Sequence, residues 1–121
     1  MQADVPFIQR LVGDPLAEAF VRHLDTEPND SPNTRLAYRR DLGQFAVFAF
    51  GPDAAPPLAW TSLNRARARA FLVALARAEA EPATVRRKLS ALRTFYRFLV
   101  REGHLRENPF AGLRGPRLHR E

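Results

Sequence analysis

The sequence contains no cysteine, so neither disulfide bonds nor thiolate metal sites can form. No apolar run approaches the ~18 residues of a membrane-spanning helix. The opening stretch, MQADVPFIQR, has an early acid and lacks the apolar segment of a secretory signal. The three histidines are scattered, and no glycine-rich phosphate loop is present. We therefore expect a cytoplasmic protein with no membrane partner, no metal site and no cofactor.

Lysine is almost absent, because eighteen of the nineteen basic residues are arginine and only Lys88 is lysine. Residues 1–30 hold two arginines and six acids, whereas residues 61–121 hold fourteen basic residues and five acids. Arginine suits paired hydrogen bonds to phosphates and to guanine edges, although codon usage in a GC-rich genome would also enrich it. The uneven charge, with a net value of +6, favours a polyanionic partner.

Four segments have the periodicity of amphipathic helices. Each begins at a residue type that caps helices or at a proline, which suits the first turn. The predicted helices cover residues 15–25, 32–50, 62–78 and 82–102, and they start, in order, at Asp14, Ser31, Thr61 or Ser62, and Pro82. Gly103 is expected to end the last helix as a left-handed cap.

The other segments show little periodicity. Residues 1–14 are predicted as a tail, and residues 114–121 as the start of a linker. Before that linker, Asn108 and Pro109 open a short final turn. No strand-type alternation of useful length and no internal repeat occurs. The predicted fold class is therefore all-α, a bundle of four helices with a short fifth, and residues 15–113 form the predicted domain.

The last predicted helix separates charge from apolar residues most clearly. On a wheel of 100° per residue, seven basic and hydroxyl side chains fall in one arc of roughly 120° on the side away from the apolar stripe. The arc contains Arg86, Arg87, Ser90, Arg93, Thr94, Arg97 and Arg101. No acid occurs between residues 83 and 101, although like charges at helical spacing repel one another. The arc predicts contact with nucleic acid, and the alternative is a solvated helix face.

The second predicted helix offers weaker candidates. Thr34 lies in the first turn, where free backbone N–H groups favour a phosphate. Arg35, Arg39 and Arg40 are spread around the helix rather than gathered on one stripe. Asn33 and Thr34 could equally act as capping residues.

Two long segments resemble those of a known family. Residues 31–48, SPNTRLAYRRDLGQFAVF, contain in order the family's Ser, Asn-Thr, Ala-Tyr, Asp-Leu and aromatic. Residues 82–113, PATVRRKLSALRTFYRFLVREGHLRENPFAGL, contain its Thr, basic pair, Leu-Ser-Ala-Leu-Arg, Phe-Tyr, Phe-Leu and Asn-Pro. Over about residues 16–116 the chain therefore resembles the N-terminal, core-binding domain of tyrosine recombinases of the phage integrase and Xer type.

The resemblance implies a SAM-like helical domain that forms half of a C-shaped clamp around a recombination half-site, alongside other recombinase subunits. Two helices of that domain approach the major groove, and the second and fourth predicted helices would take their place here. Thr34, Arg40, Thr84, Arg87 and Ser90 match positions near DNA, and the wheel adds Arg86. The full set of DNA-binding candidates is Thr34, Arg35, Arg39, Arg40, Thr84, Arg86, Arg87, Ser90, Arg93 and Thr94.

The resemblance has one departure and one consequence for catalysis. The turn AEAEP before the last helix lacks the glycine that the family often has there, so we expect a differently shaped turn. Strand exchange in the family needs a second domain, in which a tyrosine attacks a phosphate held by Arg, Lys and His. Tyr38 and Tyr96 lie on apolar faces and are predicted as core residues. We therefore expect no catalytic residue here, and a linker at residues 114–121 toward a catalytic domain that this chain lacks.

Three other classes of function stay open at this point. The chain could be a free-standing regulatory protein that blocks recombination sites. It could be a helical interaction module whose basic face meets an acidic protein. A self-sufficient nuclease or recombinase is the third alternative, although the sequence shows no catalytic constellation for it.

Overall fold

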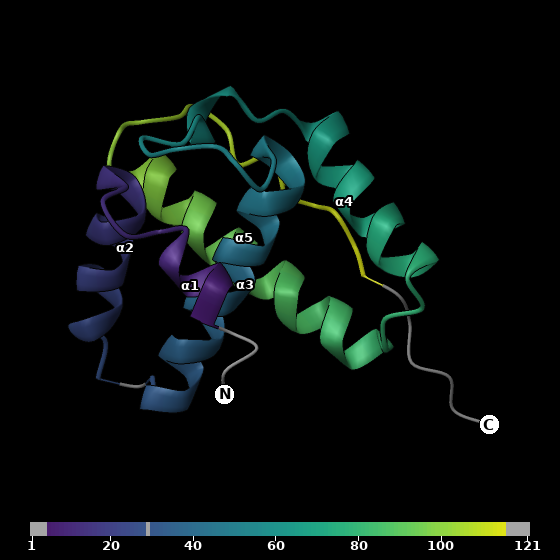
Figure 1. Cartoon of the computed structure of the whole chain (residues 1–121), viewed down its shortest axis with the longest axis horizontal. Coiled ribbons are helices and arrows are strands. Elements are labelled where there is room, and N and C mark those ends of the chain that lie inside the picture. The colour runs from purple at the N-terminus through teal and green to yellow at the C-terminus, as the bar shows by residue number, and fades with distance from the viewer. Residues whose placement is uncertain (1–4, 29, 116–121) are drawn as a thin grey trace. The chain divides into compact units, whose positions relative to one another are not determined.

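All regular structure in the computed structural model is helical within the residues that it describes, 5–28 and 30–115. The elements are α1 (Val5–Gln9), α2 (Pro15–Asp25), α3 (Pro32–Phe50), the short 3-10 helix η2 (Trp60–Ser62), α4 (Arg65–Arg77) and α5 (Pro82–Arg101) (Figure 1). The predicted all-α fold class is confirmed. The chain divides into two compact units, residues 1–60 and residues 61–121, and this division was not predicted.

Capping side chains begin both long helices of the first unit. Asp14 accepts a hydrogen bond from the backbone N–H of Ala17 at 2.9 Å, at the start of α2. Ser31 accepts one from the backbone N–H of Thr34 at 3.1 Å, at the start of α3. A proline follows each cap, where its missing N–H leaves no hydrogen bond unmade. The predicted bounds of both helices are therefore confirmed.

Helix α1 was not predicted from the sequence. The prediction of a tail over residues 1–14 is wrong for Val5–Gln9, and residues 1–4 lie outside the described part of the chain. The short helix approaches α3 at Gly43, where a Cβ atom would lie 2.0 Å from the carbonyl oxygen of Phe7. Only glycine allows two backbones to come this close. The approach joins segments far apart in the sequence, so local periodicity could not reveal it.

A buried carboxylate connects two distant segments of the first unit. Asp14 is 0% exposed. Besides capping α2, it accepts hydrogen bonds from the backbone N–H of Leu58 at 2.6 Å and from Nε1 of Trp60 at 2.7 Å. Three donors therefore satisfy this carboxylate, and they tie the start of α2 to the loop before η2.

Helix α4, in the second unit, begins later than predicted. Residues 60–62 form η2, and the helix starts at Arg65 rather than at Ser62. Its cap is Asn64, whose Oδ1 accepts from the backbone N–H of Arg67 at 2.8 Å, and neither Thr61 nor Ser62 has this role. Asparagine, serine and threonine all cap helices well, so residue type alone could not select among them.

Helix α5 has its predicted bounds, and Gly103 ends it as expected. Gly103 has a φ of 86°, and the backbone N–H of the next residue, His104, donates to the carbonyl of Leu99 at 2.9 Å. This arrangement is a Schellman motif, which satisfies carbonyls at the end of a helix. After it, residues 109–112 form turns rather than a short helix. The short helix of the fold is α1 instead.

Aromatic rings pack in the interior of the second unit. Phe95 and Tyr96 are fully buried, and their ring centroids lie 5.1 Å apart in an edge-on arrangement. The ring of Phe110 lies 5.6 Å from that of Tyr96. Tyr96 is therefore confirmed as a core residue. Tyr38, in α3 of the first unit, is only partly buried, so its assignment to the core is not confirmed.

The turn between α4 and α5 contains a left-handed residue although it lacks glycine. Glu79 has a φ of 58°, and the backbone N–H of Ala80 donates to the carbonyl of Leu75 at 3.1 Å. Helices commonly end in this way, with glycine at the left-handed position. Here glutamate occupies it, at the cost of a contact between its Cβ and the following carbonyl.

We expect Glu79→Gly to raise the free energy of unfolding by roughly 0.5–1 kcal/mol, because glycine removes the steric cost of the left-handed conformation. Urea unfolding followed by circular dichroism measures the change. Glu79→Ala is the control, because alanine keeps the Cβ and should stay near the parent protein. If the glycine and alanine variants were equally stable, strain at residue 79 would not account for the difference.

Candidate nucleic-acid interface

Helix α5 presents most of the predicted basic arc to solvent. Arg86, Arg87, Ser90 and Arg97 are exposed, whereas the apolar stripe of the helix is buried. The alternation of exposed and buried positions follows the predicted wheel. Lys88 is a basic residue on the buried side of the helix, since it is only 7% exposed. Exposed arginines therefore occupy one side of α5 with no acid of the helix among them.

The first turn of α5 lacks a side-chain cap. Asp14, Ser31 and Asn64 cap α2, α3 and α4, but Glu81 makes no such hydrogen bond before α5. Thr84 lies partly buried in that first turn. Backbone N–H groups at a helix N-terminus carry partial positive charge and favour anions. The start of α5 therefore suits a phosphate group.

Arg93 and Thr94 of the predicted arc make hydrogen bonds within the chain. The guanidinium of Arg93, which is partly buried, donates to the carbonyl of Phe110 at 3.4 Å and to that of Leu113. The hydroxyl of Thr94 donates to the carbonyl of Ser90 at 2.9 Å. The guanidinium of Arg93 is therefore engaged in hydrogen bonds within the protein.

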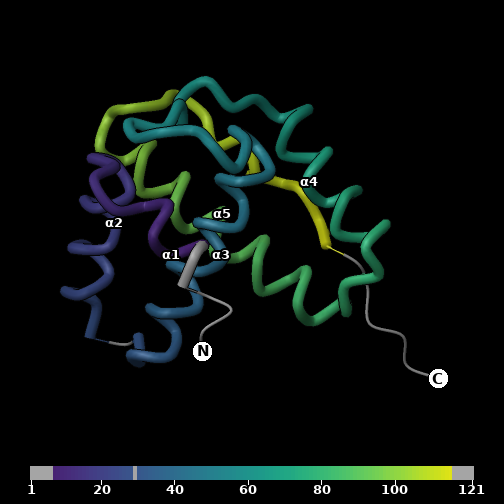
Figure 2. Tube along the Cα trace, viewed as in Figure 1, coloured from purple at the N-terminus to yellow at the C-terminus, as the bar shows by residue number. Residues whose placement is uncertain are grey.

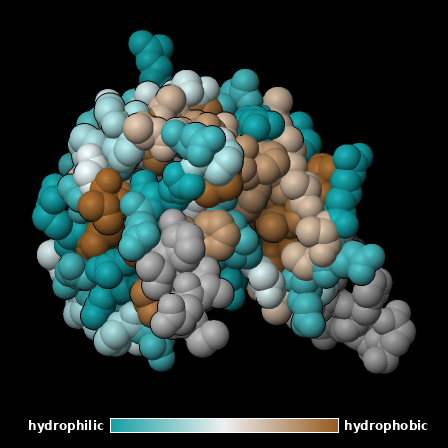
Figure 3. Space-filling model, viewed as in Figure 1, coloured by the Kyte–Doolittle hydropathy of each residue, from teal (hydrophilic) through white to brown (hydrophobic). Residues whose placement is uncertain are grey.

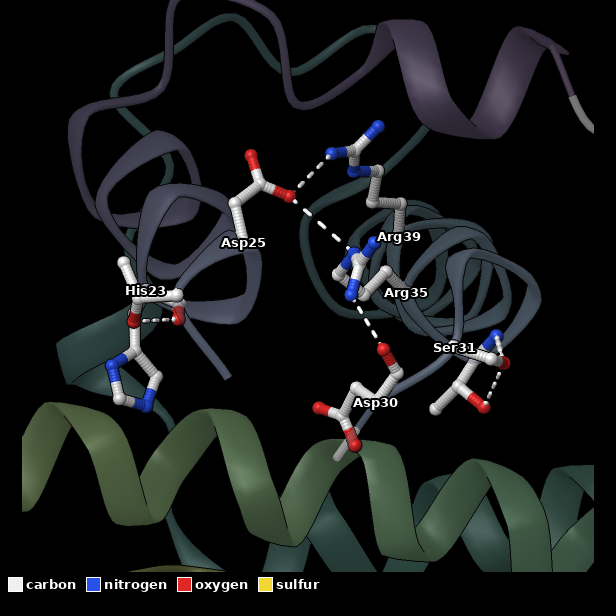
Figure 4. A network of polar contacts seen from close by, with 8 residues as sticks. His23, Asp25, Asp30, Ser31, Arg35 and Arg39 are labelled. Atoms are coloured by element: carbon white, nitrogen blue, oxygen red, sulfur yellow. Dashed lines mark hydrogen bonds and ion pairs between the residues drawn. The ribbon is translucent and has the colours of Figure 1, made fainter. Parts of the chain in front are cut away.

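Two predicted arginines of α3 share one acid (Figure 4). Nε of Arg35 lies 3.6 Å, and Nη2 of Arg39 3.5 Å, from Oδ1 of Asp25 at the end of α2. Arg35 also donates to the carbonyl of Asp30 at 2.6 Å. The structure thus brings these two side chains together around a carboxylate, which partly neutralises them. This arrangement could not be predicted from the sequence, because Asp25 lies across a turn from the two arginines rather than at helical spacing.

The two other α3 candidates also have local partners. Nε of Arg40 lies 3.6 Å from Oδ1 of Asp41, which is buried. The hydroxyl of Thr34 lies 3.0 Å from that of Ser31, within the cap of the helix. The N-cap of α3 is Ser31, so neither Asn33 nor Thr34 is the capping residue that the sequence allowed. The α3 candidates belong to the first unit and the α5 candidates to the second, and each group is described by itself.

Three arginines that were not selected from the sequence line a groove of about 700 Å³ in the second unit. They are Arg65, Arg69 and Arg114, and the apolar wall includes Val73, which is 44% exposed. Apolar side chains are visible over α4 in the space-filling view (Figure 3). The charges could be read from the sequence, but the groove could not, because it requires residues 112–115 to fold back beside α4 and α5.

Burial raises the pKa of Tyr96 well above its ordinary value, so its phenol stays protonated. In the part of the chain that the structure describes, no three metal-binding side chains gather. Within residues 5–28 and 30–115, no helix is both long and apolar enough to cross a membrane.

Comparisons with known proteins agree with the resemblance noted in the sequence. The family model of the phage integrase N-terminal SAM-like domain matches residues 17–103. The tyrosine recombinase XerC of Xylella fastidiosa (strain M23) is 41% identical over 106 residues, which cover 88% of this chain and 35% of that protein. XerC of Roseiflexus castenholzii is 36% identical, over 86% of this chain and 32% of that protein. The chain thus spans about a third of the length of these relatives. No solved structure matches it significantly.

Proposed function

We propose, from the premise that this chain belongs to the family of phage integrase N-terminal SAM-like domains, that it binds duplex DNA as half of a clamp around a recombination half-site. The observation that supports this most directly is the exposed, acid-free basic side of α5. Repulsion among its arginines costs stability in the free protein, and a polyanion removes that cost. The XerC relatives are named as tyrosine recombinases.

The proposal gives different tasks to different residues. Arg86 and the uncapped first turn of α5 bind phosphates, because both offer positive charge at the start of the helix. Arg87 reads a base edge, for which a guanidinium suits the two acceptors of guanine. Ser90 adds a hydroxyl donor near Arg86 and Arg87. Thr34 and Arg40, on α3, contribute weaker contacts, since both already have partners in the protein.

The strand-cleaving chemistry is proposed to lie outside these 121 residues. Tyr96 is buried and stays protonated, so it cannot serve as a nucleophile in the folded state. Tyr38 is the other tyrosine, and the sequence contains no His-x-x-Arg pattern of the family type. Other recombinase subunits would supply further contacts on the same DNA, and we propose a cytoplasmic location for the protein.

A chemical-shift titration with a short mixed-sequence DNA duplex tests this function. We expect the backbone amides of residues 83–90 to shift most, with smaller shifts at the start of α3. No shift at low salt would contradict DNA binding and favour a protein-interaction module. Shifts confined to residues 65–69 would show that the protein binds DNA through a different face.

The ion pairs of Asp25 predict a substitution that strengthens DNA binding. We expect Asp25→Asn to raise duplex affinity roughly two- to fivefold, because it releases Arg35 and Arg39 from a partly exposed acid. Fluorescence anisotropy at low salt measures the affinity. Asp53→Asn is the control, because it makes the same change in net charge at an exposed position on a loop. Equal gains in both variants would mean that overall charge, and not the release of α3, is responsible.

A further inference from the structure

The segment after α5 forms turns that are held by both backbone and side-chain hydrogen bonds. Asn108 begins the segment, and its Oδ1 accepts from the backbone N–H of Phe110 at 2.9 Å. Its Nδ2 donates to the carbonyl of Arg93 at 3.1 Å. Phe110 is 0% exposed and Leu113 is also buried. The carbonyl of Phe110 accepts from the backbone N–H of Leu113 at 3.2 Å, and further donors to the carbonyls of this segment come from side chains of α4 and α5.

Two arginines supply these donors. Arg93, on α5, donates to the carbonyls of Phe110 and Leu113 through two different nitrogens of one planar guanidinium. Arg65, the first residue of α4, donates to the carbonyl of Ala111. The segment is thus held from both helices of the second unit. A guanidinium is suited to this role, because its donors have a fixed geometry and none of them can be lost by deprotonation.

The segment held in this way runs back along α5 (Figure 2). At its far end, a Cβ atom on Gly115 would lie 3.0 Å from Cγ of Arg86 and 3.7 Å from Cδ2 of Leu89. The backbone at residue 115 therefore lies against the first half of α5. That half also carries the arginines proposed to contact DNA.

We infer that Arg93, supported by Arg65, is a positioning residue that fixes the course of residues 109–115 back along α5. The relatives are about three times as long as the matched region, so most of such a protein lies outside it. Gly115, the last residue that the structure describes, lies against Arg86 at the basic side of α5. The functional meaning of this placement beside the DNA-binding side of α5 rests on the proposed function. The hydrogen bonds of Arg93 do not depend on that proposal. Arg93 is accordingly removed from the proposed set of DNA contacts.

Spin labelling of the free 121-residue protein tests the inference without DNA. The chain has no cysteine, so Arg114→Cys, at an exposed position, gives a single labelling site. We expect the label to broaden the amide signals of Arg86 and Leu89. Adding Arg93→Ala should weaken that broadening at least twofold and speed hydrogen exchange of the Leu113 amide about tenfold. Arg93→Lys should restore part of both effects, because one ammonium can still donate to a carbonyl.

Arg97→Ala is the matched control, because Arg97 lies one turn further along the same side of α5 and is exposed. It should leave both the broadening and the exchange unchanged. The inference is wrong if Arg93→Ala leaves the broadening as in the parent protein, or if Arg97→Ala weakens it equally. A separate salt titration with duplex DNA distinguishes the two proposals. If Arg93→Ala lowered the salt slope by about 0.9 while the broadening persisted, Arg93 would be a phosphate contact instead.

Discussion

Asp14→Ala is expected to lower the free energy of unfolding of the first unit by about 3–5 kcal/mol. The carboxylate is fully buried, and its removal leaves three donors without acceptors: the N–H groups of Ala17 and Leu58, and Nε1 of Trp60. Each buried donor without a partner costs about 1–3 kcal/mol, and the loss of a buried charge returns part of the total. The variant should therefore be among the most destabilising single substitutions in the chain.

Trp60 is the only tryptophan, so its fluorescence reports unfolding at the site itself. Urea titration of Asp14→Asn should give an intermediate loss. Asparagine keeps one acceptor oxygen, but its amide N–H would face the backbone N–H of Leu58. Asp53→Ala, on an exposed loop, is the control and should change stability by less than about 0.5 kcal/mol. A small effect of Asp14→Ala, similar to that of the control, would contradict the structural role of the network.

Of the roles of Asp14, one could be predicted from the sequence and the others could not. Its role as the cap of α2 follows from local chemistry, because Asp before Pro is a typical helix start. Its bonds to Leu58 and Trp60 could not be predicted, since they join segments that are distant in the sequence. The bounds of α2, α3 and α5 depend on caps and periodicity within each helix, and they were predicted. Helix α1 depends on a close approach at Gly43, and it was missed.

The candidate site also has features that could be predicted from the sequence and features that could not. The exposed side of α5 follows from a wheel, because exposure along a helix is periodic. The partners of Arg35, Arg39 and Arg93 come from a turn, another helix and a returning segment. A wheel treats all arginines of an arc alike and cannot show which ones already donate to backbone carbonyls. Which of them contact DNA stays a prediction for the experiments above.

The largest effect on binding is expected from reversing the charge of two arginines at once. R86E/R87E should weaken binding to a duplex on the order of 100-fold at low salt, because two contacts of about 1–3 kcal/mol each are lost and two acids then face the DNA. The salt slope should also fall by about 1, since Arg86 is the proposed phosphate contact of the pair and each such contact contributes about 0.9. Fluorescence anisotropy between about 50 and 200 mM salt measures both quantities.

The fold should survive this double change, which makes the result interpretable. Acids near the start of α5 interact favourably with the helix dipole and relieve repulsion among its basic residues. We therefore expect a thermal midpoint equal to or above that of the parent protein. R77E/R106E is the control, because it reverses two exposed arginines of the second unit outside the basic arc. If this control lost as much affinity and as much salt slope as R86E/R87E, binding would follow net charge alone. The start of α5 would then have no special role in recognising DNA.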